Sequence, residues 1–171
     1  MKISPNELEI YSVASREAAR RGGQVLLKWM GKTTTREKGF RDLVTQADLE
    51  SQQVIQDFLK SEFPDHQFIG EETTGESDTT SHSDFCWIVD PLDGTTNYVH
   101  SLRSFAVSIA LYHRQTPLVG TVLDPVLEEC YWASRGLGAK LNGEPIHASG
   151  CKEIDKSLFV FSFPRGMTRT N

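Results

Sequence analysis

Two long stretches with helical periodicity come first in the sequence, and only short strand-like segments follow them. The first helix is expected to begin at Ser4, because its hydroxyl can cap a helix that carries Pro5 in its first turn and Glu7 at the third position. The second is expected over residues 47–62, with Pro64 just beyond its end. This order favours an α+β fold, with N-terminal helices packed on a mainly antiparallel β-sheet.

The strands are predicted from short apolar or β-branched segments, at residues 67–69, 85–89, 105–112, 118–123, 130–133 and 158–163. Residues 33–38 are β-leaning as well, and Asn142-Gly143 indicates a tight hairpin turn. The polar stretch from Thr73 to Ser83 is expected to form a mobile surface loop. Because no repeat or linker divides the chain, one domain over residues 1–171 is expected.

The composition excludes several classes of protein. The 171 residues carry 18 basic against 23 acidic side chains, and no basic surface that would favour a nucleic acid dominates this count. Three widely spaced cysteines, Cys86, Cys130 and Cys151, argue against a disulfide framework or a zinc cluster. The sequence has no apolar signal core and no apolar run that could span a bilayer, so a cytoplasmic protein without a membrane partner is expected.

The segment from Asp90 to Asn97 holds the densest group of chemically useful residues, directly after an apolar strand. Pro91 cannot continue a strand ladder and Gly94 frees the backbone to turn. Asp90 and Asp93 therefore lie together at the mouth of a turn, where backbone N–H groups can receive a phosphate. Two carboxylates this close repel each other unless a cation lies between them, which favours a hard divalent ion such as Mg²⁺.

A simpler interpretation stays open for each of these acidic residues. Asp-Pro and Asp-Gly are common turn formers, so the segment after the strand could be only a turn. Glu71 follows Gly70 at another predicted strand end, and an adjacent strand could bring it beside Asp90; taken alone, it fits a solvated acidic loop. Asp42 and Asp48 could likewise be a solvated loop residue and a helix cap.

Residues 87–100 closely resemble the first signature of the inositol monophosphatase family, which are Mg²⁺-dependent, lithium-sensitive phosphomonoesterases. Further segments resemble the family in the same order, at residues 42–48, 68–72, 105–110 and 136–143. The resemblance covers nearly the whole chain. It implies the layered αβαβα fold of inositol phosphatases and fructose bisphosphatases, and a homodimer, since dimers are usual in the family.

The resemblance also implies a role for each site residue. The implied metal ligands, for two or three Mg²⁺ ions, are Glu71, Asp90, the backbone carbonyl of Leu92, and Asp93. Gly94 and Thr95 are implied to bind the phosphate through their backbone amides, with Asp93 beside them. The Thr95 hydroxyl and Asp48 are implied to orient the attacking water, and Glu71 also counts as catalytic. Lys38 is a further candidate near that water.

These roles imply the hydrolysis of a phosphate monoester by a metal-activated water, without a covalent phosphoenzyme. Residues 95–98 resemble the inositol-phosphatase form, so inositol 1-phosphate is the expected substrate. Fructose 1,6-bisphosphate, a nucleotide 3′-phosphate and histidinol phosphate are the alternatives. Cys86, His100 and His113 are expected to be structural or exposed, because a site of hard oxygen ligands does not need thiolate or imidazole.

The sequence departs from the family in one respect. The family's second signature, a Trp-Asp-x-Ala-Ala-Gly segment with a further metal ligand, is not found, and no Trp-Asp pair occurs. A truncated chain that lacks the C-terminal αβ layer is therefore expected. Two functions stay open: the N-terminal part of an active phosphomonoesterase, or a catalytically silent module that binds metal and phosphate without turnover.

Overall fold

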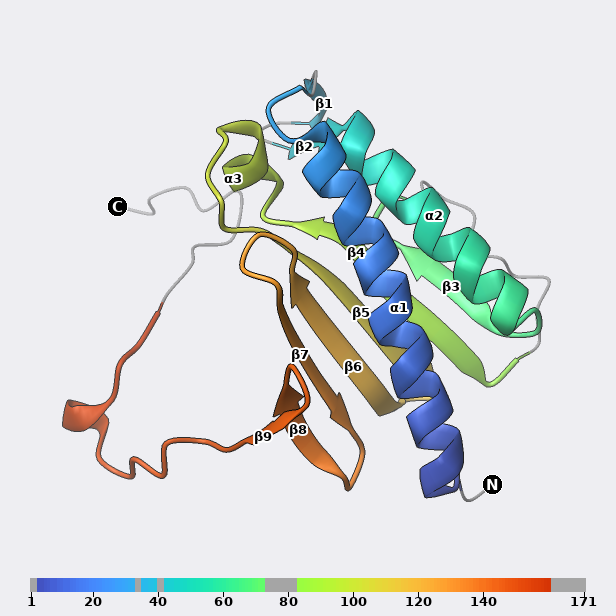
Figure 1. Ribbon diagram of the computed structural model, residues 1–171, viewed down its shortest axis with the longest axis vertical. Helices are drawn as coiled ribbons and strands as arrows, with labels where there is room; N and C mark the ends of the chain where they lie inside the picture. Colours follow the sequence, from blue (N-terminus) through green and yellow to red (C-terminus); the bar gives the residue numbers. More distant parts are fainter. Residues whose placement is uncertain (1–2, 33–34, 40–41, 73–82, 161–171) are drawn as a thin grey trace, which may run out of the picture.

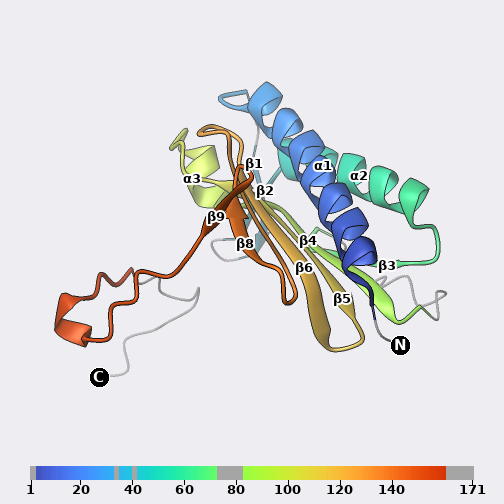
Figure 2. The same cartoon turned by 60° about the horizontal axis from the view of Figure 1, so that its bottom comes forward.

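Two helices lie side by side across one face of a β-sheet (Figure 1). The computed structural model describes residues 3–32, 35–39, 42–72 and 83–160. The helices are α1 (Pro5–Trp29) and α2 (Gln46–Glu62), and Figure 2 shows both on the same side of the strands. The expected α+β arrangement of N-terminal helices on a sheet is confirmed.

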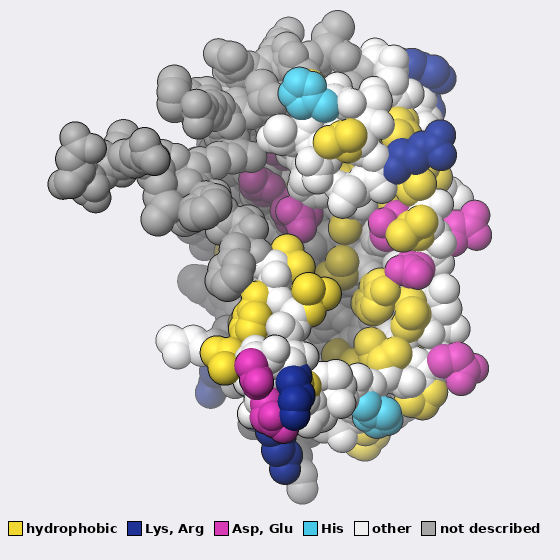
Figure 3. All heavy atoms as spheres, turned by 90° about the vertical axis from the view of Figure 1, so that its left-hand side faces the viewer, with side chains coloured by type: hydrophobic (Ala, Val, Ile, Leu, Met, Phe, Trp, Pro, Cys, Tyr) yellow, Lys and Arg dark blue, Asp and Glu magenta, His cyan; other side chains and the backbone are white. Residues whose placement is uncertain are grey.

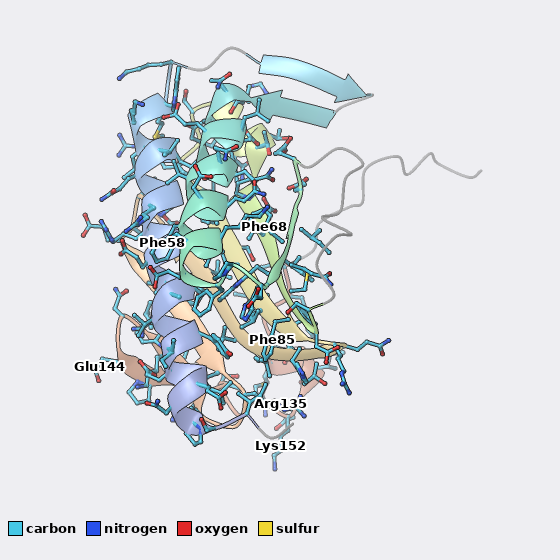
Figure 4. The ribbon with its side chains drawn as sticks, turned by 90° about the vertical axis from the view of Figure 1, so that its right-hand side faces the viewer. Phe58, Phe68, Phe85, Arg135, Glu144 and Lys152 are labelled. Carbon is cyan, nitrogen blue, oxygen red and sulfur yellow. The ribbon has the colours of Figure 1, made fainter. Side chains whose placement is uncertain are left out.

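Each helix begins with a reciprocal cap that the sequence encodes locally. The Ser4 hydroxyl accepts from the Glu7 N–H at 3.3 Å, and the Glu7 carboxylate accepts from the Ser4 N–H at 2.8 Å. Thr45 and Asp48 form the same arrangement at the start of α2. The guanidinium of Arg21 on α1 lies over the ring of Phe58 on α2 (Figure 4), with its central carbon 4.1 Å from the centre of the Phe58 ring.

Seven strands form the main sheet, in the order β3-β4-β5-β6-β7-β8-β9. Their bounds are Gln67–Gly70, Phe85–Asp93, Ala106–His113, Thr116–Asp124, Glu129–Ser134, Gly138–Leu141 and Glu144–Ile146. β3 pairs parallel to β4, and the other neighbours in this sheet are antiparallel. A separate hairpin joins β1 (Thr35–Gly39) to β2 (Asp42–Thr45), and two short helices are α3 (Thr95–Val99) and a 3₁₀ turn at Ile154–Lys156.

The two faces of this sheet differ in what covers them. On one face, alternate residues such as Trp87, Val107 and Ile109 are at most 1% exposed and form the core beneath the helices. On the other, the strand registers align one small or apolar residue from every strand, namely Ile69, Ile88, Ala110, Gly120, Ala133, Ala139 and Ile146. Ile69 and Ile88 of this row remain 45% and 42% exposed. Figure 3 shows a side of the molecule where hydrophobic side chains reach the surface next to acidic ones.

Several expectations about individual segments were less accurate. The strand predicted over residues 158–163 is wrong at residues 158–160, which have no regular structure, and Leu158 is 93% exposed. The remainder of that segment, and residues 73–82 of the loop expected from Thr73 to Ser83, lie outside the described residues. The predicted turn is confirmed: Asn142 and Gly143 join β8 to β9 with φ angles of 49° and 98°.

The three cysteines are free thiols, as expected from their spacing. Over the described part of the chain, no helix is both long enough and apolar enough to cross a membrane.

Candidate active site

Glu71 and Asp90 lie at the same edge of the sheet, because the two strands that carry them are parallel. The register pairs Gly70 with Val89, so each acidic residue directly follows a paired residue. The Glu71 N–H donates to the Val89 carbonyl at 3.0 Å, which fixes the turn after β3 against β4. The Glu71 carboxyl lies close enough to Asp90 to act on its charge. The sequence-based expectation that an adjacent strand brings them together is consistent with this arrangement.

The pKa of Asp90 reflects its burial beside other acidic groups. Burial raises the pKa of Asp90, and the Glu71 carboxyl raises it further through repulsion and a shared hydrogen bond. The Asp93 charge acts in the same direction, while the Leu92 N–H, which donates to Asp90 Oδ1 at 3.1 Å, opposes it. A cation bound here would offset the repulsion. The donor chemistry, carboxylate and carbonyl oxygens, is that of a hard divalent ion.

The turn after Asp90 has a backbone shape that only glycine fits easily. Gly94 has a φ of 91°, and a Cβ on it would lie 3.0 Å from the Ser104 carbonyl oxygen. The chain then enters α3, where the Thr95 hydroxyl donates to the Leu92 carbonyl at 3.1 Å. This hydrogen bond fixes the carbonyl that the family resemblance assigns to the metal. Asp93, the last residue of β4, is exposed.

Asp48 is a buried carboxylate at the start of α2, with only 1% of its surface exposed. Its Oδ2 accepts from both the N–H and the hydroxyl of Thr45, so Asp48 is part of the cap of this helix. Burial raises the pKa of Asp48 to about 6, and the Glu72 charge adds to this, whereas the Thr45 hydrogen bonds oppose it. Burial and then the charge of Asp48 raise the pKa of Tyr98, whose hydroxyl donates to the Leu26 carbonyl at 2.6 Å.

The structure thus brings most of the predicted site residues into one region. Glu71, Asp90, Leu92, Asp93 and Thr95 lie on the ends of β3 and β4 and the turn that follows. The side chains of Lys38 and Asp42 lie outside those that the structure describes. Within the described residues, no three His, Cys, Asp or Glu side chains form a preassembled metal centre. The fit for a cation therefore rests on the Glu71 and Asp90 pair and on the Leu92 carbonyl.

Comparison with known proteins shows the family to which this chain belongs. The sequence profile of the inositol monophosphatase family matches residues 7–170. The chain belongs to this family. It is 43% identical over 168 residues to inositol monophosphatase 1 of Solanum lycopersicum, a match that covers 96% of this chain and 60% of that protein.

Solved structures of the inositol monophosphatase family have the same fold. The extragenic suppressor protein suhB of Bartonella henselae matches with a TM-score of 0.77 and 33% identity, over 81% of this chain and 54% of that one. An inositol monophosphatase/NADP phosphatase complexed with Mg²⁺ and phosphate matches with a TM-score of 0.64 and 35% identity, over 72% of this chain and 47% of its own. The chain therefore spans about half to three-fifths of the relatives it matches.

Three residues near this inositol-monophosphatase-like site were missed by reading the sequence: Ser51, Gln52 and Tyr98. Ser51 and Gln52 follow Asp48 at three and four positions, the spacing that places residues on one helix face. Asp48, Ser51 and Gln52 of α2 are each at most 9% exposed, and Tyr98 of α3 is 1% exposed. A polar residue repeated on the buried face of a helix was the signal that could have found them.

Proposed function

We propose that this chain provides the metal and phosphate site of a Mg²⁺-dependent phosphomonoesterase, which hydrolyses inositol 1-phosphate to inositol and phosphate. The observation that carries the proposal is the parallel register of β3 and β4, which places Glu71 and Asp90 at one edge of the sheet, where burial and then the Glu71 charge raise the pKa of Asp90. Like charges held together at a strand edge are what a cation site requires. The name of the tomato relative supports the choice of substrate.

In the proposed site, Glu71, Asp90, Asp93 and the Leu92 carbonyl hold two or three Mg²⁺ ions. The bound metal supplies a water of lowered pKa and offsets charge on the phosphoryl oxygens. The related phosphatase complexed with Mg²⁺ and phosphate supports this choice of ion. The left-handed turn at Gly94 presents the amides of Gly94 and Thr95 to the phosphate.

Thr95 and Asp48 orient the attacking water in this proposal. The Thr95 hydroxyl donates to the Leu92 carbonyl, and its oxygen retains lone pairs that can accept from water. Thr45 bonds Oδ2 of Asp48, and in the proposed mechanism Oδ1 accepts from the same water. Each hydrogen bond already made by these side chains restricts their rotation, so the water meets groups that are held in place.

The test is phosphate release by this 171-residue chain, measured with and without Mg²⁺. Inositol 1-phosphate should be hydrolysed faster than fructose 1,6-bisphosphate, a nucleotide 3′-phosphate or histidinol phosphate. Calorimetric titration with Mg²⁺ runs in parallel. Metal binding without phosphate release would instead support a silent binding module, and absence of metal binding would contradict both functions.

We also propose that the protein forms a homodimer, as the family resemblance implies. Light scattering coupled to size-exclusion chromatography measures this directly, and a monomer at micromolar concentration would contradict it.

A further inference from the structure

We propose that Gln52, assisted by Ser51, is a positioning residue that sets the separation of the Glu71 and Asp90 carboxylates. The two residues hold the ends of β3 and β4 to helix α2. The inference rests on the metal site proposed above and adds the part of the fold that holds that site in shape.

Gln52 fixes the turn that follows β3. Its side-chain Oε1 accepts from the Glu72 N–H at 2.9 Å, and only 9% of the residue is exposed. The side chain lies directly over Gly70: a Cβ at that position would be 2.1 Å from Oε1. Gly70 therefore leaves the space that Gln52 occupies, and the peptide after Glu71 is held from the helix side.

Ser51 fixes the turn that follows Asp90. It is fully buried, and its hydroxyl donates to the Pro91 carbonyl at 3.2 Å. That carbonyl lies between Asp90 and Leu92, both of which belong to the proposed metal site. Two successive residues of one helix thus contact the backbone next to each of the two carboxylates.

This arrangement makes α2 a rigid link between the two strand ends. The strands are tied directly by their parallel ladder and, just beyond it, by the Glu71 N–H, which donates to the Val89 carbonyl at 3.0 Å. Two carboxylates at one strand edge repel each other, and this repulsion tends to open the pair. Because metal ligands must be held at a fixed spacing, residues that hold the ligands usually contribute about tenfold or more to metal affinity.

The test compares Gln52→Met with a matched change one residue away. Methionine keeps the length of the side chain but removes the acceptor oxygen. Gln53→Met is the control, because Gln53 is exposed on the same helix and donates to Asp57 at 2.8 Å, away from the strand ends. Mg²⁺ affinity is measured by calorimetry on each full-length chain, and the melting temperature is measured without metal.

We expect Gln52→Met to weaken Mg²⁺ binding about tenfold and Gln53→Met to leave it unchanged. Hydrogen exchange gives a readout that does not need metal: the Glu72 amide should exchange faster in Gln52→Met, and slow exchange should return in Gln52→Glu, which keeps an acceptor. Equal affinity in Gln52→Met and the native chain, or a lower melting temperature with unchanged affinity, would overturn the inference.

Ser51→Ala is the second variant, in case Gln52→Met does not fold. It removes the donor to the Pro91 carbonyl and only shortens the side chain, so folding is expected. It should also weaken Mg²⁺ binding, and unchanged affinity would contradict the proposed link. If the native chain itself binds no Mg²⁺, the proposed function fails; if it binds and the variants bind equally, only this inference fails.

Discussion

Thr45 donates both its backbone N–H and its hydroxyl to the carboxylate of Asp48, yet Asp48 still holds its proton more tightly in the folded chain than in the unfolded one. Burial raises its pKa from 3.8 to about 6, and the hydrogen bonds offset only part of this effect. Since the folded state binds the proton more tightly, the contribution of Asp48 to stability falls as pH rises from about 4 to about 6.

Asp48→Asn should therefore stabilise the metal-free protein at pH 8, by at most about 3 kcal/mol, and by little at pH 4. Asparagine keeps an acceptor oxygen for Thr45 but carries no charge to bury. Urea unfolding in the presence of a chelator, at both pH values, measures the difference. Asp57→Asn, an exposed position on the same helix, should show no such gain at pH 8. A stability gain for Asp48→Asn that is equal at both pH values would contradict the explanation.

Asp90→Asn should abolish Mg²⁺-dependent phosphate release, with a loss of about 100-fold or more. The same change should raise the metal-free melting temperature, because it removes the repulsion from Glu71 and Asp93. Phosphate release and thermal unfolding are measured on one preparation. Asp84→Asn is the control, since Asp84 is an exposed residue just before the start of the same strand, paired with Arg114. Retained activity in Asp90→Asn would refute the metal site.

Gly94→Ala should destabilise the fold by about 2 kcal/mol or more, because it combines a strained φ with a close contact. The φ is 91°, and the new Cβ would lie 3.0 Å from the Ser104 carbonyl oxygen. Gly136→Ala separates the two effects: its φ is 76°, but nothing lies within 4 Å of a Cβ there. It should cost only the backbone strain, about 1 kcal/mol. Equal losses in the two variants by urea unfolding would show that the contact at Gly94 does not matter.

His66 should make the protein less stable as pH falls below about 6.5. Its ring stacks between Phe63 and Phe85, with centroids 4.9 and 4.7 Å away, and its Nδ1 is buried without a hydrogen-bond partner in the described part of the chain. Burial lowers the pKa of His66, and the Asp65 charge opposes this. A lowered folded-state pKa means that stability is complete above the unfolded pKa and is lost as pH falls.

His66→Phe should flatten the dependence of melting temperature on pH between 7 and about 5, since phenylalanine fills the stack and cannot take up a proton. His147→Phe, at an exposed position, is the comparison. A slope in His66→Phe as steep as in the native chain would assign the pH dependence to other groups.

Local chemistry explains why parts of this fold could be read from the sequence. The cap at Ser4, which was predicted, involves residues three positions apart, and the turn at Gly94 is set by a few adjacent residues; the cap at Thr45 has the same spacing but was not predicted. Strand pairing is different, because it depends on which segments meet in space. The apolar residues 158–160 have a strand-like pattern, but no described strand pairs with them.

The candidate site shows the same division. The sequence placed Glu71 and Asp90 at two strand ends and allowed that an adjacent strand could bring them together, but only the three-dimensional pairing of β3 with β4 defines their shared edge. Gln52 carries no sequence motif. Its role becomes visible only when its side chain is seen over Gly70, eighteen positions away in the chain.

The direction of one short strand has a consequence for the whole site. β3 runs parallel to β4, against the pattern of the other neighbours in its sheet. Had β3 run the other way, Glu71 would lie at the far end of four residues, roughly 13 Å from its present place. No single ion could then touch both carboxylates. The proposed metal site therefore depends on the parallel pairing of β3 with β4, which cannot be read from any single residue of either strand.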